Sequence, residues 1–223
     1  MTLSLLLISQ SSYAALEDLT TYTESDPDSA ITVTSTRSTF TNIQSRAHTS
    51  YVYKDYGAAH FTDFIHRFTV FVSSASTTSM LVPWMMTNTA AQDFKDAENA
   101  NVGQVIYLYR DGSNVDYIGI EDEANDNGAS WSGFVLNTIY YLEVQRSGTT
   151  LSCKIYSDSG YTNIISTISI TCNTTSWRYF NCLASENSGA STSIVKSGYS
   201  ENYDFSATPT VSTGTSNFMQ VLE

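Results

Sequence analysis

The sequence predicts an all-β protein, an antiparallel β-sandwich, and the clearest evidence is the stretch of residues 140–170. Apolar and polar side chains alternate there in three runs, which Ser147-Gly148 and Asp158-Ser159-Gly160 separate. Alternation with a period of two, interrupted by turn residues, is typical of an antiparallel meander with one buried face. The second observation is that only residues 93–101 have any helical character.

The other predicted strands show similar alternation. Pro83 has no backbone N–H, so its apolar run is expected at a sheet edge or at a bulge. Residues 121–130 are acidic and rich in turn formers, so we expect a loop there. The expected strands cover residues 31–35, 51–53, 61–72, 80–86, 105–109, 117–120, 177–184 and 193–205.

The length of 223 residues is enough for one large core, so we expect a single domain. We predict a sandwich over residues 16–206, an N-terminal arm at 1–15 and a C-terminal tail at 207–223. The arm contains the apolar run Leu3 to Ile8, and no Lys or Arg precedes Arg37. It therefore lacks the positive region of a signal peptide, and the run is too short to span a bilayer.

The charge of the chain limits its partners. Ten Lys and Arg against 22 Asp and Glu give a formal net charge of −12. Binding to nucleic acid or to an anionic membrane requires clustered basic side chains, so the composition argues against both. Cations and neutral sugars remain compatible with it.

Two residue types of potential chemical interest are expected in the core. His66 falls on the apolar face of residues 61–72, which favours a core histidine over a metal ligand or a base. Cys153 falls on the inward face of the meander, where a buried reduced thiol is expected. A disulfide between Cys172 and Cys182 is the alternative to two further free thiols, and the sequence leaves it open.

Four segments resemble the concanavalin A-like lectin/glucanase superfamily, in particular its laminin-G-like members of the microbial or phage surface-protein type. They are YVYKDYG at 51–57, DFIHRFTVFVSS at 63–74, YYLEVQRSGTTLSCKIYSDS at 140–159 and SGYSENYDF at 197–205. The resemblance covers roughly residues 17–206. It implies a jelly-roll sandwich, here with extended N- and C-terminal arms, and a fold that serves lectins, glycosidases and surface proteins alike.

A catalytic motif is the first feature that the resemblance suggests. The enzymes of that superfamily carry acidic residues at alternate positions of one strand, E-x-D-x-x-E or E-x-D-x-E. The nearest match places Glu121 and Glu123 on one side of a strand and Asp122 on the other, with Asn125 in place of the acid. We therefore predict that the chain is not an enzyme, and a glycoside hydrolase is the second alternative.

Two kinds of binding site are expected. Sugar rings bind to aromatic faces, for which Trp84, Trp131 and Tyr117 are the candidates. Laminin-G-like domains often bind calcium at a rim, and oxygen ligands suit that ion. The candidate calcium ligands are Asp122, Glu123, Asn125 and Asp126, with Asp111 and Asp116 as the next cluster.

The leading functional hypothesis is a non-catalytic structural or assembly protein, displayed on a virion, a filament or another extracellular surface. Its partners would be copies of itself or other surface subunits, joined when an apolar arm adds a strand to a neighbour's open sheet edge. The residues expected to drive this assembly are Leu3, Leu5, Leu7, Phe218 and Val221. The first alternative is a glycan-binding module of the lectin type.

Overall fold

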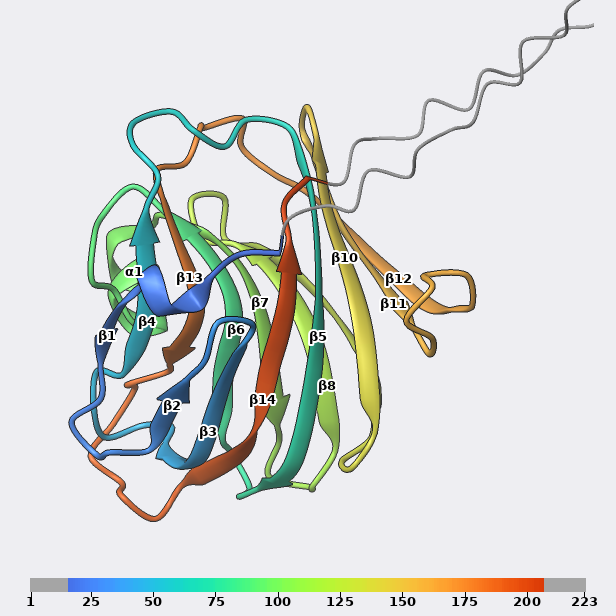
Figure 1. Cartoon of the computed structure of the whole chain (residues 1–223). Coiled ribbons are helices and arrows are strands. Elements are labelled where there is room, and N and C mark those ends of the chain that lie inside the picture. The colour runs from blue at the N-terminus through green and yellow to red at the C-terminus, as the bar shows by residue number, and fades with distance from the viewer. Residues whose placement is uncertain (1–15, 207–223) are drawn as a thin grey trace, which may run out of the picture.

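Two antiparallel sheets of seven strands each pack face to face in the computed structural model, which describes residues 16–206 (Figure 1). The predicted fold class is therefore confirmed. Sheet A has the order β1 (Thr23–Ser25), β4 (Tyr51–Asp55), β13 (Tyr179–Ser185), β6 (Met80–Thr87), β7 (Gln104–Arg110), β8 (Asp116–Asp122) and β9 (Asn127–Phe134).

Sheet B contains the meander that the sequence predicts. Its order is β12 (Ile164–Thr171), β11 (Thr150–Tyr156), β10 (Ile139–Ser147), β5 (Phe64–Ala75), β14 (Val195–Asp204), β3 (Arg37–Gln44) and β2 (Ile31–Val33). A 3-10 helix, η1 (Leu19–Thr21), precedes β1. The two ends of the described chain meet beside β14, where the Glu17 N–H donates to the Tyr203 carbonyl at 2.8 Å. The predicted assembly residues Leu3, Leu5, Leu7, Phe218 and Val221 lie outside the described residues.

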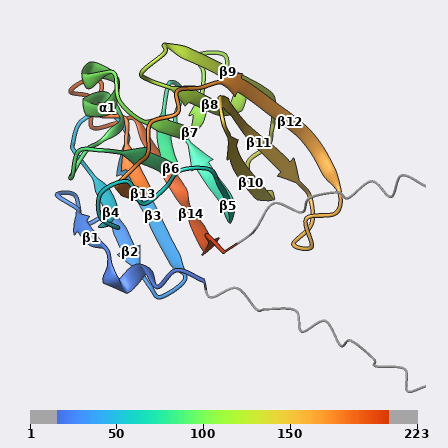
Figure 2. The same cartoon turned by 90° about the horizontal axis from the view of Figure 1, so that it is seen from above.

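The inner faces of the two sheets form one core, seen from above in Figure 2. His66 is buried in it and accepts a hydrogen bond from the indole N–H of Trp84 at 3.1 Å. Burial holds the pKa of His66 well below its usual value, so the ring stays neutral. The prediction of a core histidine is confirmed. Cys153, Cys172 and Cys182 are all buried free thiols, and the alternative disulfide is not formed.

Of the two positions expected for Pro83, a sheet edge or a bulge, the structure has the bulge. Its strand, β6, lies between β13 and β7 in the middle of sheet A. The β6–β7 register shifts between Leu81 and Trp84. A bulge lets a central strand accommodate a residue that has no N–H to donate to the ladder.

The predicted loop at residues 121–130 is instead most of a hairpin. Strand β8 continues to Asp122 and β9 begins at Asn127, so only four residues turn between them. The two strands pair from Asp116–Phe134 to Asp122–Asn127. Hydrogen bonding to a neighbouring strand thus overrides the turn propensity of Asn, Asp and Gly in this stretch.

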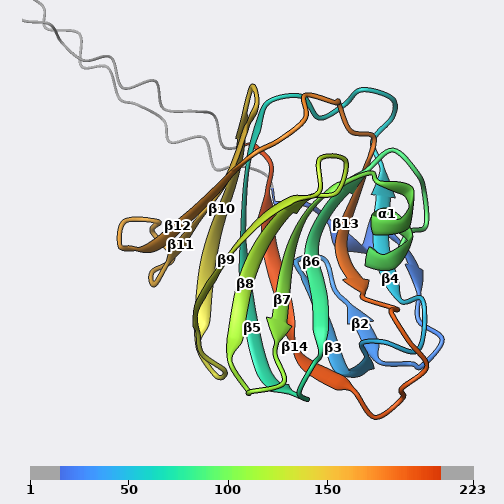
Figure 3. The same ribbon diagram turned by 180° about the vertical axis from the view of Figure 1, so that it is seen from behind.

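One short helix, α1 (Phe94–Ala100), confirms the helical character predicted for residues 93–101. The Asp93 side chain caps its N-terminus by accepting from the Asp96 N–H at 2.9 Å. Phe94 and Ala97 pack on the outer face of sheet A in a second apolar cluster, with Met80, Val82, Met85, Val105 and Ala184. Figure 3 shows this helix beside β13 and β4, while β7, β8 and β9 carry no helix. None of the helices within residues 16–206 is long and apolar enough to cross a membrane.

A tyrosine of sheet B connects the two sheets at the Pro83 bulge. The buried Tyr203 hydroxyl lies within hydrogen-bond distance of the carbonyl oxygens of Pro83 and, at 2.9 Å, Cys182. These two carbonyls belong to neighbouring strands of sheet A. Without the hydroxyl, the Pro83 carbonyl would lose this donor inside the core, whereas the Cys182 carbonyl would keep the Ser200 hydroxyl at 3.1 Å.

We expect Tyr203→Phe to lower the free energy of unfolding by about 1–3 kcal/mol, because the buried Pro83 carbonyl loses the donor that the Tyr203 hydroxyl supplies. Urea denaturation followed by tryptophan fluorescence measures the change. The control is Tyr199→Phe, which removes a hydroxyl from the outer face of sheet B. Equal losses in the two variants would contradict the role assigned to the Tyr203 bridge.

Candidate functional site

The outer face of sheet A carries three tyrosines on the β7–β8 hairpin. Side chains alternate between the faces of a strand, so Ile106 and Leu108 point into the core while Tyr107 and Tyr109 point outward. Tyr117 is paired with Tyr109 across the two strands, and their ring centroids are 6.1 Å apart with an interplanar angle of 27°. The hairpin register therefore gathers the three rings on one patch.

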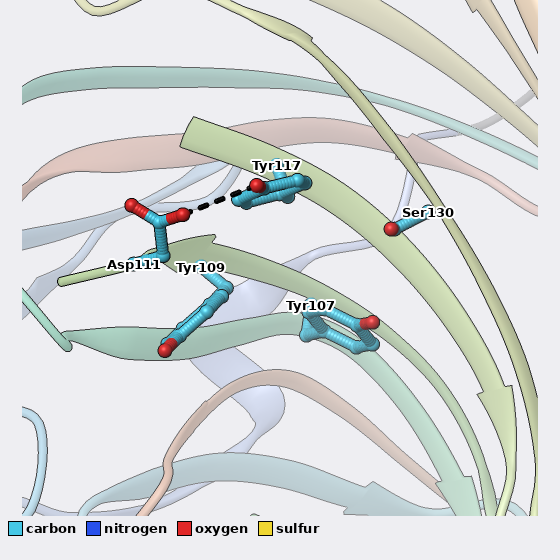
Figure 4. A pocket seen from close by; sticks show the side chains of 5 residues that line it. All are labelled: Tyr107, Tyr109, Asp111, Tyr117 and Ser130. Carbon is cyan, nitrogen blue, oxygen red and sulfur yellow. Dashed lines mark hydrogen bonds between the residues drawn. The ribbon is translucent and has the colours of Figure 1, made fainter. Parts of the chain in front are cut away.

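These rings line a pocket of about 370 Å³. Asp111 from the β7–β8 turn and Ser130 from β9 complete its lining. Figure 4 shows Asp111 and Tyr117 at one end and Tyr107 and Ser130 toward the other. An open hollow with aromatic walls and a few polar groups is the usual form of a small-ligand site.

Hydrogen bonds fix the Asp111 carboxylate at its end of the pocket. The backbone N–H groups of Val115 and Ser113 donate to one oxygen at 2.9 and 2.8 Å. The Tyr117 hydroxyl donates to the other oxygen at 3.1 Å. These donors, the Val115 N–H foremost, lower the pKa of Asp111, so it is ionised at neutral pH and orients the Tyr117 ring.

Glycine at position 119 leaves space for the Tyr107 ring. Gly119 is paired with Tyr107 on one side and with Ser130 on the other. A Cβ atom added at Gly119 would lie 1.9 Å from Cζ of Tyr107, so the ring lies directly over the glycine backbone. Any larger residue there would displace Tyr107 from the pocket wall.

Two carboxyl groups lie next to the pocket on the same face of β8 and just beyond its end. Glu121 follows Gly119 by two residues, and burial together with Glu98 and Asp126 raises its pKa. Glu123 is 5% exposed, and its Oε1 atom has no hydrogen-bond partner. Burial, followed by the charge of Glu121, raises the pKa of Glu123 to about 8. The pair thus offers a protonated carboxyl beside an ionisable one, which is the chemistry of general acid–base catalysis.

The predicted calcium ligands do not fit a calcium ion as they lie. Asp122 is fully buried and points away from Glu121 and Glu123, toward the loop after β12. Its two oxygens accept from Ala124, from the Asn125 amide and from both the N–H and the side-chain amide of Asn173. Among residues 16–206, no group of three or more His, Cys, Asp or Glu side chains is arranged to hold a metal ion. Asp122 instead connects the end of β8 to sheet B.

The three aromatic candidates for sugar binding are separated by the fold. Trp84 is fully buried between the sheets, so its selection as a surface residue is wrong. Trp131 is paired with Ile118 and packs from the inner side of β9 against Tyr140. Tyr117 alone lies on the outer face and lines the pocket.

Sequence reasoning missed Tyr107 and Tyr109, which form the rest of the aromatic wall. The signal is present in residues 106–109 and 117–120, where isoleucine or leucine alternates with tyrosine or glycine. The alternation defines two faces of each strand, but a single sequence does not show which of them faces the solvent.

No protein-family model matches the sequence, and the comparison with curated proteins finds no match. Solved structures do match. The VIP36 exoplasmic/lumenal domain in its Ca²⁺/Man3GlcNAc-bound form superposes with a TM-score of 0.56 and 12% identity, over 86% of this chain and 88% of that one. A legume lectin-like domain from Entamoeba histolytica gives a TM-score of 0.53 and 14% identity, over 83% and 89%.

An alginate lyase from Alteromonas sp. 272 has the same fold, with a TM-score of 0.54 and 10% identity over 82% of this chain and 92% of that one. The chain therefore has the concanavalin A-like jelly-roll fold that its sequence segments resemble. Identities this low establish the fold alone.

The prediction that the chain is not an enzyme is corrected by this comparison. It rested on the lack of a complete E-x-D-x-x-E motif. Alginate lyases are enzymes and share the fold, so the architecture hosts catalysis as well as sugar binding, and a missing motif does not exclude activity.

The Glu123 carboxyl makes stability depend on pH. An unfolded glutamate releases its proton near pH 4.5, whereas Glu123 in the folded protein releases it near pH 8. The folded state therefore binds more protons in this interval, and stability falls as pH rises through it. We expect Glu123→Gln to be more stable than the wild type at pH 8.5, by no more than about 5 kcal/mol, and close to it at pH 4.5.

Urea denaturation at the two pH values measures this difference. Glu24→Gln, which removes the same charge from an exposed position on β1, is the control and should change the pH dependence far less. A wild-type stability that is unchanged between pH 4.5 and 8.5 would contradict the assignment.

Proposed function

We propose that the chain binds a glycan on the outer face of sheet A, in the pocket of Tyr107, Tyr109 and Tyr117. The observation that carries this proposal is the pocket itself. Three half-buried aromatic rings surround a hollow of about 370 Å³ that also offers hydroxyl and carboxylate groups. Sugar rings have apolar CH faces and a polar rim, and such a lining complements both.

The architecture supports the proposal by analogy. VIP36 has been solved with Man3GlcNAc and with shorter mannose ligands bound, on a fold of the same class. A shared fold supports sugar binding as a class of function. The proposal therefore rests on the local geometry, and its tests address the residues of the pocket.

Changing the aromatic wall should weaken glycan binding. The test is a glycan array with neutral, acidic and amine-bearing oligosaccharides, followed by calorimetry on the glycans retained. Tyr117→Ala should raise Kd about tenfold, since one aromatic contact contributes about 1–1.5 kcal/mol. Gly119→Val should have a similar effect, because it displaces Tyr107 without removing a ring.

The matched control is Tyr141→Ala, which removes a half-buried tyrosine from the outer face of sheet B. Circular dichroism and thermal melting establish that each variant is folded. The proposal fails if the wild type retains no glycan, or if Tyr141→Ala weakens binding as much as Tyr117→Ala does.

Assembly through a sheet edge is the second candidate function, and strand β12 favours it. This strand forms one edge of sheet B, and its eight residues carry no charge. Ile164 and Ile165 are 52% and 42% exposed. The edge strands β1 and β2 are three residues long, and β9, which also has eight uncharged residues, carries no exposed large apolar side chain. A long, uncharged edge presents unpaired backbone groups to which another strand can add.

We propose that an extended apolar segment of a second copy adds to β12. The predicted arm with Leu3, Leu5 and Leu7 has the required composition, and it lies outside the described residues. Every second residue of the added strand would exchange backbone hydrogen bonds with β12. Although the chain has a net charge of −12, β12 contains no charged residue, so the contact would bring no like charges together.

Introducing a charge on this edge should release monomers. We expect the wild type to elute as an oligomer in light-scattering chromatography, and Ile165→Lys or deletion of residues 1–15 to elute as a monomer. Thr32→Lys on the short edge strand β2 is the control and should leave the oligomer intact. A monomeric wild type, or an oligomer insensitive to both changes, would refute assembly by this route.

A further inference from the structure

The surroundings of the tyrosine pocket are negatively charged. Asp111 is ionised at one end, and Glu121 lies two positions beyond Gly119 toward the other. Two cations near these acids are already paired, Lys95 with one of the acidic neighbours of Glu121. Arg110 donates to Asp116 at 2.9 Å, and Lys95 pairs with Glu98 on α1. None of the five residues that line the pocket is basic.

Glu123 adds a second carboxyl group beside Glu121. Its side chain is more than nine-tenths buried, and its Oε1 atom accepts no hydrogen bond. Glu121, Glu98 and Asp126 are close enough to raise its pKa. A positively charged donor bound at Glu121 would reduce the repulsion between Glu121 and its acidic neighbours Glu98 and Asp126.

The carboxyl groups of Glu121 and Glu123 also affect the pKa of Tyr107. Tyr107 has its pKa raised to about 12 by burial first and then by Glu121 and Glu123. Tyr107 is paired with Gly119 and Val105 with Glu121, so Tyr107 and Glu121 are diagonal neighbours on the outer face of sheet A. A ligand stacked on Tyr107 would therefore hold its polar substituents next to Glu121. The metal alternative is weaker, because the acids of residues 16–206 are not grouped to hold an ion.

We propose that the glycan bound in the tyrosine pocket carries free amino groups, and that an ammonium group of the sugar pairs with Glu121 beside Tyr107. This inference rests on the proposed function and specifies its ligand class. An ammonium group donates three hydrogen bonds, so it can satisfy unpartnered carboxyl oxygens while the pyranose ring stacks on tyrosine. A polyuronate such as alginate would instead bring like charges to Asp111 and Glu121.

A matched pair of oligosaccharides tests the proposal. Glucosamine hexamer and N-acetylglucosamine hexamer share a backbone and differ in the charge on nitrogen, and an alginate hexamer provides the opposite charge. Calorimetry at pH 6 in low and high salt gives the three affinities. We expect the wild type to bind the glucosamine hexamer about tenfold more tightly than the N-acetylated one at low salt. High salt should reduce this preference.

Glu121→Gln should abolish the preference while leaving the affinity for the N-acetylated hexamer unchanged. Glu24→Gln, on the far edge strand β1, makes the same change in net charge and should preserve the preference. Tyr117→Ala should weaken the binding of both hexamers.

The outcomes separate the two proposals. The amine inference is overturned if the two hexamers bind with equal affinity or if alginate binds more tightly than either. If Tyr117→Ala weakens the binding in that case, glycan binding in the pocket still stands. A preference that Glu24→Gln removes as fully as Glu121→Gln reflects net charge and also overturns the inference. Absence of binding by any of the three oligosaccharides and by the glycan array overturns the proposed function itself.

Discussion

The pairing of Tyr107 with Gly119 is the constraint on which the candidate site depends. Strands β7 and β8 must fill the core with one face while the other builds the pocket, and a shift of one residue would exchange these faces. The bulky inner residues of the hairpin make such a shift costly. Burial of the inner face thus fixes, at the same time, the place of every side chain on the outer face.

The core also supports the pocket directly from below. Lys196 reaches from β14 through the interior, where its ammonium group donates to the Leu108 carbonyl at 2.8 Å. Leu108 lies between Tyr107 and Tyr109, so this bond holds the strand that presents the two rings. Lys196 is 1% exposed, and this burial lowers its pKa to about 7. The pocket is therefore an open hollow on a rigidly supported sheet.

The sequence predicted the features that depend on local alternation of apolar and polar residues. It did not predict the features that depend on which strands become neighbours in the sheets. The meander of β10, β11 and β12, the inward direction of His66 and the short helix all follow from local periodicity. The central position of Pro83 depends on its neighbours β13 and β7, which no local pattern reveals. The sequence indicated Tyr117 as a binding residue but not Tyr107. The part of the outer face of sheet A that stays uncovered depends on where α1 packs, which local patterns do not reveal.

The three thiols of the chain have a practical consequence for studying it. Cys153, Cys172 and Cys182 are all buried, and burial raises the pKa of each, so none forms a reactive thiolate readily. A cysteine introduced at the exposed Ser132 of β9 would then be the one readily alkylated position of the folded protein. A fluorophore attached there would report events on the outer surface of sheet A without removal of any native sulfur.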